Sequence, residues 1–322
     1  MNLELNKHIF YRNESNFSEK IKRVIKSYSE NKHSLIVISD FDYTMTSLFD
    51  YDTNIQYKSS YYLYDENIIG GNQKKFEEDR KNLSDEYSKY EFDTSYDFEF
   101  RKNKMIEWYT KNIELYYNPN FTLDSIEKMI QKLKHNIKFR PKLKEYIELL
   151  MEMDIPLIIE SGGITQFIHG ILKYIIPDID ELIEKKKIAI ISNNFKFDPI
   201  SKGCCGIERE VIHCFNKADF IGNIIKNEYK EAKNILVLGD NLGDADCVKK
   251  LDVDINNVIG FGFINLSKDI LLDENKKEFI ENKIKEYNNI FDMALVGNCD
   301  YQPIINLLKS FKNLEWAINQ FY

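Results

Sequence analysis

Two aspartates, Asp40 and Asp42, stand directly behind the apolar stretch SLIVIS, which is typical of a buried strand. Carboxylates are costly to desolvate, so their place at the end of such a strand indicates that other groups compensate them there. Thr44 completes the pattern D-x-D-x-T. These residue types at this spacing suggest a site that holds a metal ion together with a phosphate.

Polar residues also follow the other predicted strands of the chain. Ser161 and Gly162 come after IPLIIE, and Lys217 follows the run KKIAII at a greater distance. Asp240 and Asp244 belong to GDNLGD, which follows NILVL. Because ligands of open parallel sheets bind at the carboxyl ends of the strands, we expect a hydroxyl, a lysine and four carboxylates to converge at one sheet edge.

Four carboxylates at one place require a cation. Each pair of like charges about 4 Å apart costs on the order of 4 kcal/mol at an effective dielectric constant of about 20. Oxygen ligands with open positions suit Mg²⁺, which keeps several waters and takes a substrate phosphate as a ligand. The formal net charge of −8 argues against non-specific binding to nucleic acid or to an anionic membrane.

The elements that position these residues alternate along the chain from residue 35 onward. Short β-rich runs are separated by helix-like segments, and this rhythm predicts an α/β fold with a parallel sheet covered on both faces. Residues 16–31 carry apolar side chains at helical spacing, which predicts a helix before the first strand. The predicted strands are 35–39, 155–159, 187–191, 234–238, 257–261 and 292–296.

One connection is too long for a simple crossover, which needs only about a dozen residues. We interpret residues 48–138 as a mostly helical inserted cap and leave the Tyr- and Asn-rich part, 50–72, unassigned. Residues 1–47 and 139–322 then form the core. Thr122 is the expected N-cap of the last cap helix. The expected cap helices are 72–90, 99–117 and 122–136.

The motifs resemble those of the haloacid-dehalogenase superfamily of phosphotransferases, with DFDYT first, Ser161 second, Lys217 third and GDNLGD fourth. Over residues 34–312, weakly in 48–85, the chain is similar to the cytosolic 5'-nucleotidase III, or pyrimidine 5'-nucleotidase, family. The resemblance implies a Rossmann-like core with an inserted cap that reads the nucleoside. It is carried by KMIEWYTKN, IPLIIESGGI, EVIHCFNKAD, NILVLGDNLGDADCV and VIGFGFIN.

The resemblance also implies roles for the residues of the motifs. Asp40 would be the nucleophile that accepts the phosphoryl group. Asp42 would protonate the leaving ribose oxygen and then activate water. The Mg²⁺ ligands would be Asp40, Asp240 and the backbone carbonyl of Asp42, with Asp244 and Thr44 in support.

Substrate contacts are expected from both the core and the cap. Lys217, Ser161 and Gly162 would bind the phosphate, and Ser161 is also expected to N-cap a helix that begins near Gly163. Glu91 falls where the family places its base-reading glutamate; the alternative is a solvated surface charge. The chain departs from the family pattern at Gly162, where alanine is usual, and at Glu160, where an apolar residue is usual.

Other candidate residues have structural interpretations. Trp108 and Tyr109 could stack on a nucleobase, but aromatic residues at helical spacing more often belong to a core. His169 and His213 are interpreted as structural or surface residues, because no second histidine stands at ligand spacing. The five cysteines form no C-x-x-C pair and are expected to be reduced thiols.

We therefore predict an Mg²⁺-dependent 5'-nucleotidase that hydrolyses nucleoside monophosphates, foremost CMP and UMP, through an aspartyl-phosphate. The open alternatives are the same chemistry on 7-methyl-GMP, a purine nucleotide or a sugar phosphate, and a nucleoside phosphotransferase. No apolar run approaches the roughly 20 residues of a membrane span, and the first residues lack the apolar region of a secretory signal. We expect a cytoplasmic monomer that binds neither nucleic acid nor membranes.

Overall fold

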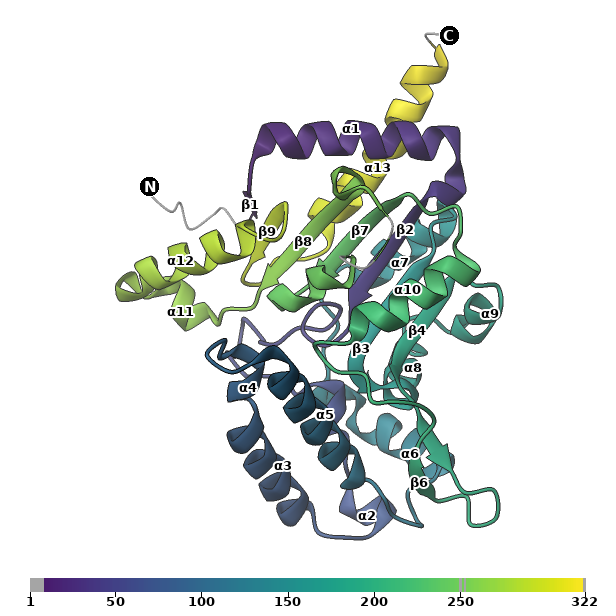
Figure 1. The fold of residues 1–322 in the computed structure, drawn as a ribbon, viewed down its shortest axis with the longest axis vertical. Coiled ribbons are helices and arrows are strands. Elements are labelled where there is room, and N and C mark those ends of the chain that lie inside the picture. The colour runs from purple at the N-terminus through teal and green to yellow at the C-terminus, as the bar shows by residue number, and fades with distance from the viewer. Residues whose placement is uncertain (1–8, 249–250, 252, 321–322) are drawn as a thin grey trace.

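A seven-stranded sheet forms the centre of the computed structural model, which describes residues 9–248, 251 and 253–320 (Figure 1). Its strand order is β1-β9-β8-β7-β2-β3-β4. Neighbouring strands are parallel, except that β1 pairs antiparallel with β9 at one edge. The strands are β1 (Ile9–Tyr11), β2 (Leu35–Asp40), β3 (Leu157–Ile164), β4 (Ile188–Asn193), β7 (Asn234–Gly239), β8 (Val258–Ile264) and β9 (Met293–Val296).

The structure confirms the predicted α/β class and contains a strand at each predicted position. It also contains strands that the sequence did not predict. β1 has only three residues, none of them fully buried, so it carries no periodic signal. β5 (Phe195–Phe197) and β6 (Cys204–Ile207) form a separate antiparallel hairpin. Both additions lie outside the parallel strands that end in the motifs D-x-D-x-T and GDNLGD.

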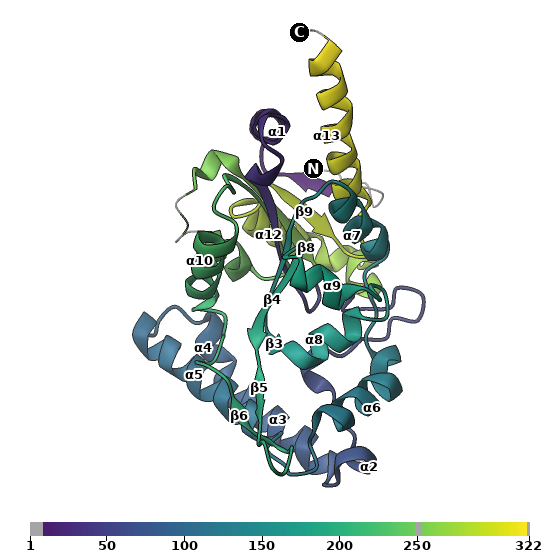
Figure 2. The ribbon, with the colours of Figure 1, turned by 90° about the vertical axis from the view of Figure 1, so that its right-hand side faces the viewer.

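Side chains alternate between the two faces of the sheet and form a hydrophobic cluster on each. Figure 2 shows helices on both sides of the sheet. On β2, Leu35 and Val37 belong to one hydrophobic cluster, and Ile36 and Ile38 to another. One face is covered by α10 (Lys217–Glu228) and α12 (Lys277–Asn288), and the other by α1 (Glu14–Glu30), α7 (Leu143–Glu152), α8 (Thr165–Leu172) and α13 (Gln302–Gln320). Two short helices, α9 (Ile179–Glu184) and α11 (Lys268–Leu272), complete the core.

The connection between β2 and β3 contains the predicted helical insertion. Thr122 caps its last helix as expected, since the Thr122 side chain accepts a hydrogen bond from the Ser125 amide. The unassigned part, 50–72, is mostly irregular, with a 3-10 turn over Ser60–Tyr62. In Figure 1, α3, α4 and α5 lie together on the side of the sheet where β2 ends. The helices of the insertion are α2 (Glu66–Ile69), α3 (Gln73–Tyr87), α4 (Lys89–Phe92), α5 (Phe98–Glu114) and α6 (Leu123–Leu133).

A helix precedes the first strand of the parallel sheet, as predicted. The α1 helix, predicted from its apolar spacing, buries Phe17, Val24, Ile25 and Tyr28, and the Asn13 side chain caps it by accepting from the Asn16 amide. Across the part of the chain that the structure describes, no helix combines the length and the apolarity that a bilayer crossing demands.

Candidate active site

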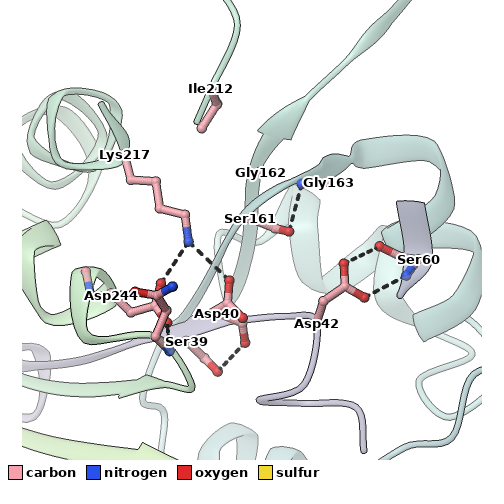
Figure 3. Close-up of polar contacts among 12 residues, drawn as sticks. Ser39, Asp40, Asp42, Ser60, Ser161, Gly162, Gly163, Ile212, Lys217 and Asp244 are labelled. Atoms are coloured by element: carbon pink, nitrogen blue, oxygen red, sulfur yellow. Dashed lines mark hydrogen bonds and ion pairs between the residues drawn. The ribbon is translucent and has the colours of Figure 1, made fainter. Parts of the chain in front are cut away.

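An ammonium group joins two of the predicted carboxylates. Lys217 begins α10, and its Nζ lies 3.2 Å from Asp40 Oδ1 and 2.9 Å from Asp244 Oδ1 (Figure 3). All three side chains are nearly buried, with exposed fractions of 7–11%. Three segments that are far apart in the sequence therefore meet at the carboxyl end of β2, as the strand-end argument predicted.

A third carboxylate completes a cluster of side chains that could bind a metal ion. Asp40, Asp240 and Asp244 each place one carboxylate oxygen within 4.8 Å of the other two. Burial raises the pKa of Asp40 to about 7 and that of Asp240 well above its ordinary value, and repulsion from the Asp244 carboxylate adds to both shifts. The repulsion among buried oxygens is what a hard divalent ion relieves, so the donor set fits Mg²⁺.

Asp42 points away from this cluster, toward the insertion. Its carboxylate accepts two hydrogen bonds from Ser60, one from the backbone N–H and one from the hydroxyl, each 2.7 Å long (Figure 3). Burial raises the pKa of Asp42, and the bonds from Ser60 partly oppose this rise. Ser60 lies in the irregular part of the insertion, where the sequence contained no signal for it. The insertion thus orients a carboxyl group that the core supplies.

The second motif differs from its predicted local structure. β3 continues through Ser161 to Ile164, because Ile164 still pairs with Asn193 on β4. The next helix, α8, begins only at Thr165, so the prediction that Ser161 caps a helix starting near Gly163 is wrong. The Ser161 hydroxyl instead accepts a hydrogen bond from the Gly163 amide at 3.0 Å (Figure 3).

Gly162 allows an aromatic ring to approach the second motif closely. A Cβ atom at this position would lie 2.8 Å from Tyr109 Cε1 and 3.0 Å from the Tyr109 hydroxyl. Any larger side chain at residue 162 would therefore displace the ring. Tyr109 comes from α5, so this contact brings the insertion directly against the predicted phosphate-binding segment.

The loop after the first motif is held in an uncommon backbone conformation. Tyr43 has a φ of 65°, in the left-handed region that few residues other than glycine adopt. The Tyr43 N–H donates to the Thr46 hydroxyl at 2.8 Å, a contact that the sequence did not reveal. Thr44, predicted as a supporting residue, is buried, and its hydroxyl has no hydrogen-bond partner among the described residues.

A cavity of about 400 Å³ extends from the acidic cluster into the insertion. Glu91 lines it together with Trp108 and Tyr109, so the structure brings these three residues toward the predicted core site. Burial raises the pKa of Glu91 to about 7, and Asn241 Nδ2 donates to Glu91 Oε1 at 3.4 Å. The interpretation of Glu91 as a solvated surface charge is therefore wrong.

The two histidines lie where their structural interpretations placed them. His213 is fully buried, and burial lowers its pKa to about 4. His169 Nε2 lies 2.6 Å from Asp180 Oδ1 near the surface. All five cysteines are free thiols; one of them, Cys214, lines the cavity.

Comparison with known proteins identifies the family. Residues 43–310 match the pyrimidine 5'-nucleotidase (UMPH-1) family, which is most of the 322-residue chain. The chain belongs to this family. It is therefore a 5'-nucleotidase, a phosphoric monoester hydrolase with a haloacid-dehalogenase-type core, as the motifs predicted.

Individual relatives of this 5'-nucleotidase cover most of its length. It is 27% identical to the human 7-methylguanosine phosphate-specific 5'-nucleotidase over 268 residues, 81% of this chain and 79% of the relative. It is 24% identical to the protein of the same description from Drosophila melanogaster over 266 residues, 81% and 75% of the two chains. The crystal structure of cytosolic 5'-nucleotidase IIIB bound to cytidine shares the fold, with a TM-score of 0.72, 22% identity and coverage of 98% and 97%.

Glu160 of this 5'-nucleotidase adds a fifth acidic side chain behind the cluster. It is 2% exposed, and its Oε1 has no hydrogen-bond partner within the described part of the chain. Burial raises the pKa of Glu160 from 4.5 to about 8. The group is therefore mostly neutral at pH 7 and adds little charge to the site.

Glu160→Gln is expected to change how stability depends on pH. The folded protein keeps the Glu160 proton up to about pH 8, whereas the unfolded chain releases it near pH 4.5. The wild type therefore loses stability as the pH rises between these values, on the order of 3 kcal/mol. In urea unfolding without added metal, the free energy of unfolding of the variant relative to that of the wild type should increase from pH 5 to pH 8.

The matched control for this experiment is Glu148→Gln, which changes an exposed glutamate on α7. Its stability should follow the wild type at every pH. Parallel wild-type and Glu160→Gln curves between pH 5 and pH 8 would contradict the expected burial effect.

Proposed function

We propose that this 5'-nucleotidase hydrolyses the pyrimidine nucleoside monophosphates CMP and UMP in an Mg²⁺-dependent reaction. The observation that supports it most is the lining of the cavity, which combines two kinds of chemistry. The core contributes Lys217 and three clustered carboxylates, and the insertion contributes Glu91 and aromatic side chains. The core residues suit a metal-bound phosphate, and the residues of the insertion suit a flat base that donates hydrogen bonds.

The core residues divide the phosphoryl transfer between them. Asp40 attacks the phosphorus and forms an aspartyl-phosphate while the bond to the ribose 5'-oxygen breaks. Asp42, whose pKa burial raises, donates its proton to that leaving oxygen and later accepts a proton from the water that cleaves the aspartyl-phosphate. Lys217 holds Asp40 in place and offsets the negative charge of the phosphoryl oxygens. Ser161 and Gly162 line the same cavity and bind the phosphoryl oxygens of the substrate.

The metal would be held by the carboxylates of Asp40 and Asp240 and by the backbone carbonyl of Asp42. Bound Mg²⁺ supplies charge neutralisation for the phosphate and for the anionic nucleophile. Asp244 supports the arrangement through Lys217 and through the Asn241 amide, which donates to Asp244 Oδ2 at 2.9 Å.

We also propose that residues 48–138 act as the cap that selects the base. An ionised Glu91 only accepts hydrogen bonds, so it favours a base with an amino group facing it. Cytosine has an exocyclic amino group and uracil has none, so CMP should be the better of the two pyrimidine substrates. The second candidate is 7-methyl-GMP, because the human and Drosophila relatives are named for it. A cationic methylated base would also be attracted by Glu91 and by the face of Trp108.

Phosphate release from CMP, UMP, 7-methyl-GMP, GMP and AMP tests the proposed substrates. The expected result is the highest kcat/KM with CMP and complete loss of activity when a chelator removes Mg²⁺. A kcat/KM for 7-methyl-GMP at least about tenfold above that for CMP would replace the first candidate by the second, since tenfold corresponds to about 1.4 kcal/mol of discrimination.

Glu91→Gln should lower kcat/KM for CMP by about 10- to 100-fold, because a hydrogen bond from the base to a charged acceptor becomes a weaker neutral one. UMP should be affected less, so the CMP-to-UMP ratio falls. Initial rates with the two nucleotides measure this ratio. Glu86→Gln, an exposed change on α3, serves as the control. An unaltered ratio in Glu91→Gln would show that Glu91 does not read the base.

A further inference from the structure

A buried arginine donates hydrogen bonds to backbone carbonyls of the loop that contains the first motif. Arg140 is 2% exposed and lies just before α7. Its Nε donates to the Thr44 carbonyl at 2.9 Å and its Nη2 to the Tyr43 carbonyl at 2.6 Å. Nη1 donates to the Cys299 carbonyl at 3.1 Å, and Nη2 also donates to Asn265 Oδ1 at 2.8 Å. One planar guanidinium thus satisfies four acceptors from three separate segments.

Asn265, directly after β8, continues this network to the acidic cluster. Its Nδ2 donates to the Tyr43 carbonyl at 2.9 Å and to Asp240 Oδ2 at 3.3 Å. The orientation of the amide is determined by its neighbours, because arginine offers only donors and must face the Asn265 oxygen. The nitrogen then necessarily faces the two acceptors.

We propose that Arg140 and Asn265 are positioning residues for the metal site, which fix the D-x-D-x-T loop and the Asp240 carboxylate in one relative arrangement. The inference rests on the proposed Mg²⁺ role of Asp40, Asp42 and Asp240. The amide of Asn265 donates to Oδ2 of Asp240, so Oδ1 would be the oxygen available to a metal ion.

The backbone conformation of the D-x-D-x-T loop explains why it needs these hydrogen bonds. Tyr43 holds a left-handed conformation with a φ of 65°, and its carbonyl receives bonds from both Arg140 and Asn265. The backbone carbonyl of Asp42, one residue earlier, is the proposed metal ligand, so the network limits its freedom before an ion arrives. Ligands whose outer partners are in place bind metal more tightly, typically by 10- to 100-fold. Lysine cannot replace Arg140, since it lacks the planar fork.

Binding of Mn²⁺, followed by electron paramagnetic resonance on the purified full-length chain, tests this inference without relying on turnover. Asn265→Leu has nearly the same volume and removes both donated bonds. We expect it to weaken Mn²⁺ binding by about 10- to 100-fold. Arg140→Lys should weaken it in the same direction. In activity assays the Mg²⁺ concentration for half-maximal rate should rise, while KM for CMP at saturating Mg²⁺ stays within about twofold.

The controls separate this inference from the proposed function. Asn282→Leu, an exposed change on α12, should bind Mn²⁺ as the wild type does. If Asn265→Leu does not fold, the Mn²⁺ affinity of Asn265→Ser is measured in its place and tests the same expectation. Wild-type affinity in the folded Asn265 variant would overturn the positioning role alone. Absence of Mn²⁺ binding by the wild type itself would overturn the proposed metal site and this inference with it.

Discussion

Asp40→Asn is expected to lower kcat for CMP by at least about 10⁴-fold, to below detection. Uncatalysed hydrolysis of phosphate monoesters is among the slowest of reactions, with enzymatic accelerations up to roughly 10²¹-fold. An amide at this position does not attack phosphorus, so no covalent intermediate forms. Release of inorganic phosphate at saturating Mg²⁺ measures the loss.

The same variant should fold at least as well as the wild type, which separates lost chemistry from lost structure. The pKa of Asp40 is raised from 3.8 to about 7 in the folded protein, so the ionisation of Asp40 lowers stability as the pH rises between these values, and the loss is complete at about pH 8. Thermal unfolding at pH 8 without Mg²⁺ should therefore give Asp40→Asn an equal or higher midpoint. Asp178→Asn, an exposed change, is the control for both measurements. Wild-type turnover in Asp40→Asn would disprove the assignment of the nucleophile.

Asp42→Asn should lower kcat for CMP by about 10²- to 10⁴-fold, the usual range for a general acid–base residue. Asparagine keeps the size of the side chain, and its oxygen can still accept from the Ser60 amide, so the geometry is preserved. What it loses is the proton for the ribose oxygen and the base that activates water. Steady-state phosphate release measures the change.

A substrate with a better leaving group distinguishes the two roles of Asp42. Nitrophenolate leaves without protonation, so Asp42→Asn should still form the aspartyl-phosphate from p-nitrophenyl phosphate but hydrolyse it slowly. A rapid burst of nitrophenolate, equal in amount to the enzyme, should precede slow turnover. The absence of any burst, together with an unchanged kcat for CMP, would exclude Asp42 as the acid–base residue.

The insertion contacts the core around the cavity at two places. Ser60 donates two hydrogen bonds to Asp42, the proposed acid–base residue. Glu91 lies within reach of Asn241, a residue of the fourth motif, at 3.4 Å. Substitutions in the insertion should therefore alter the rate of the chemical step as well as the choice of base.

Much of this protein was determined by local features of its sequence. The apolar run that ends in Asp40 forms a strand because β-rich, buried residues precede a polar turn, and the same holds for the run before Asp240. Strand ends in a parallel sheet meet at one edge, so the convergence of Asp40 and Asp240 was predictable from the positions of their strands. Lys217 begins α10, far beyond the end of β4, and its role was predicted from the resemblance to the family motifs. The capping residue Thr122 was predictable too, because capping acts within one helical turn.

Only the tertiary structure decided how the site is held together. The contacts between Ser60 and Asp42 and between Asn265 and Asp240 join segments that share no periodic pattern, and polar residues in irregular segments are compatible with many partners. Ser161 lies in a strand and not at a helix N-terminus, because pairing with β4 extends β3 past it. Periodicity describes a residue's own element, whereas hydrogen-bond partners across the chain depend on how the elements pack.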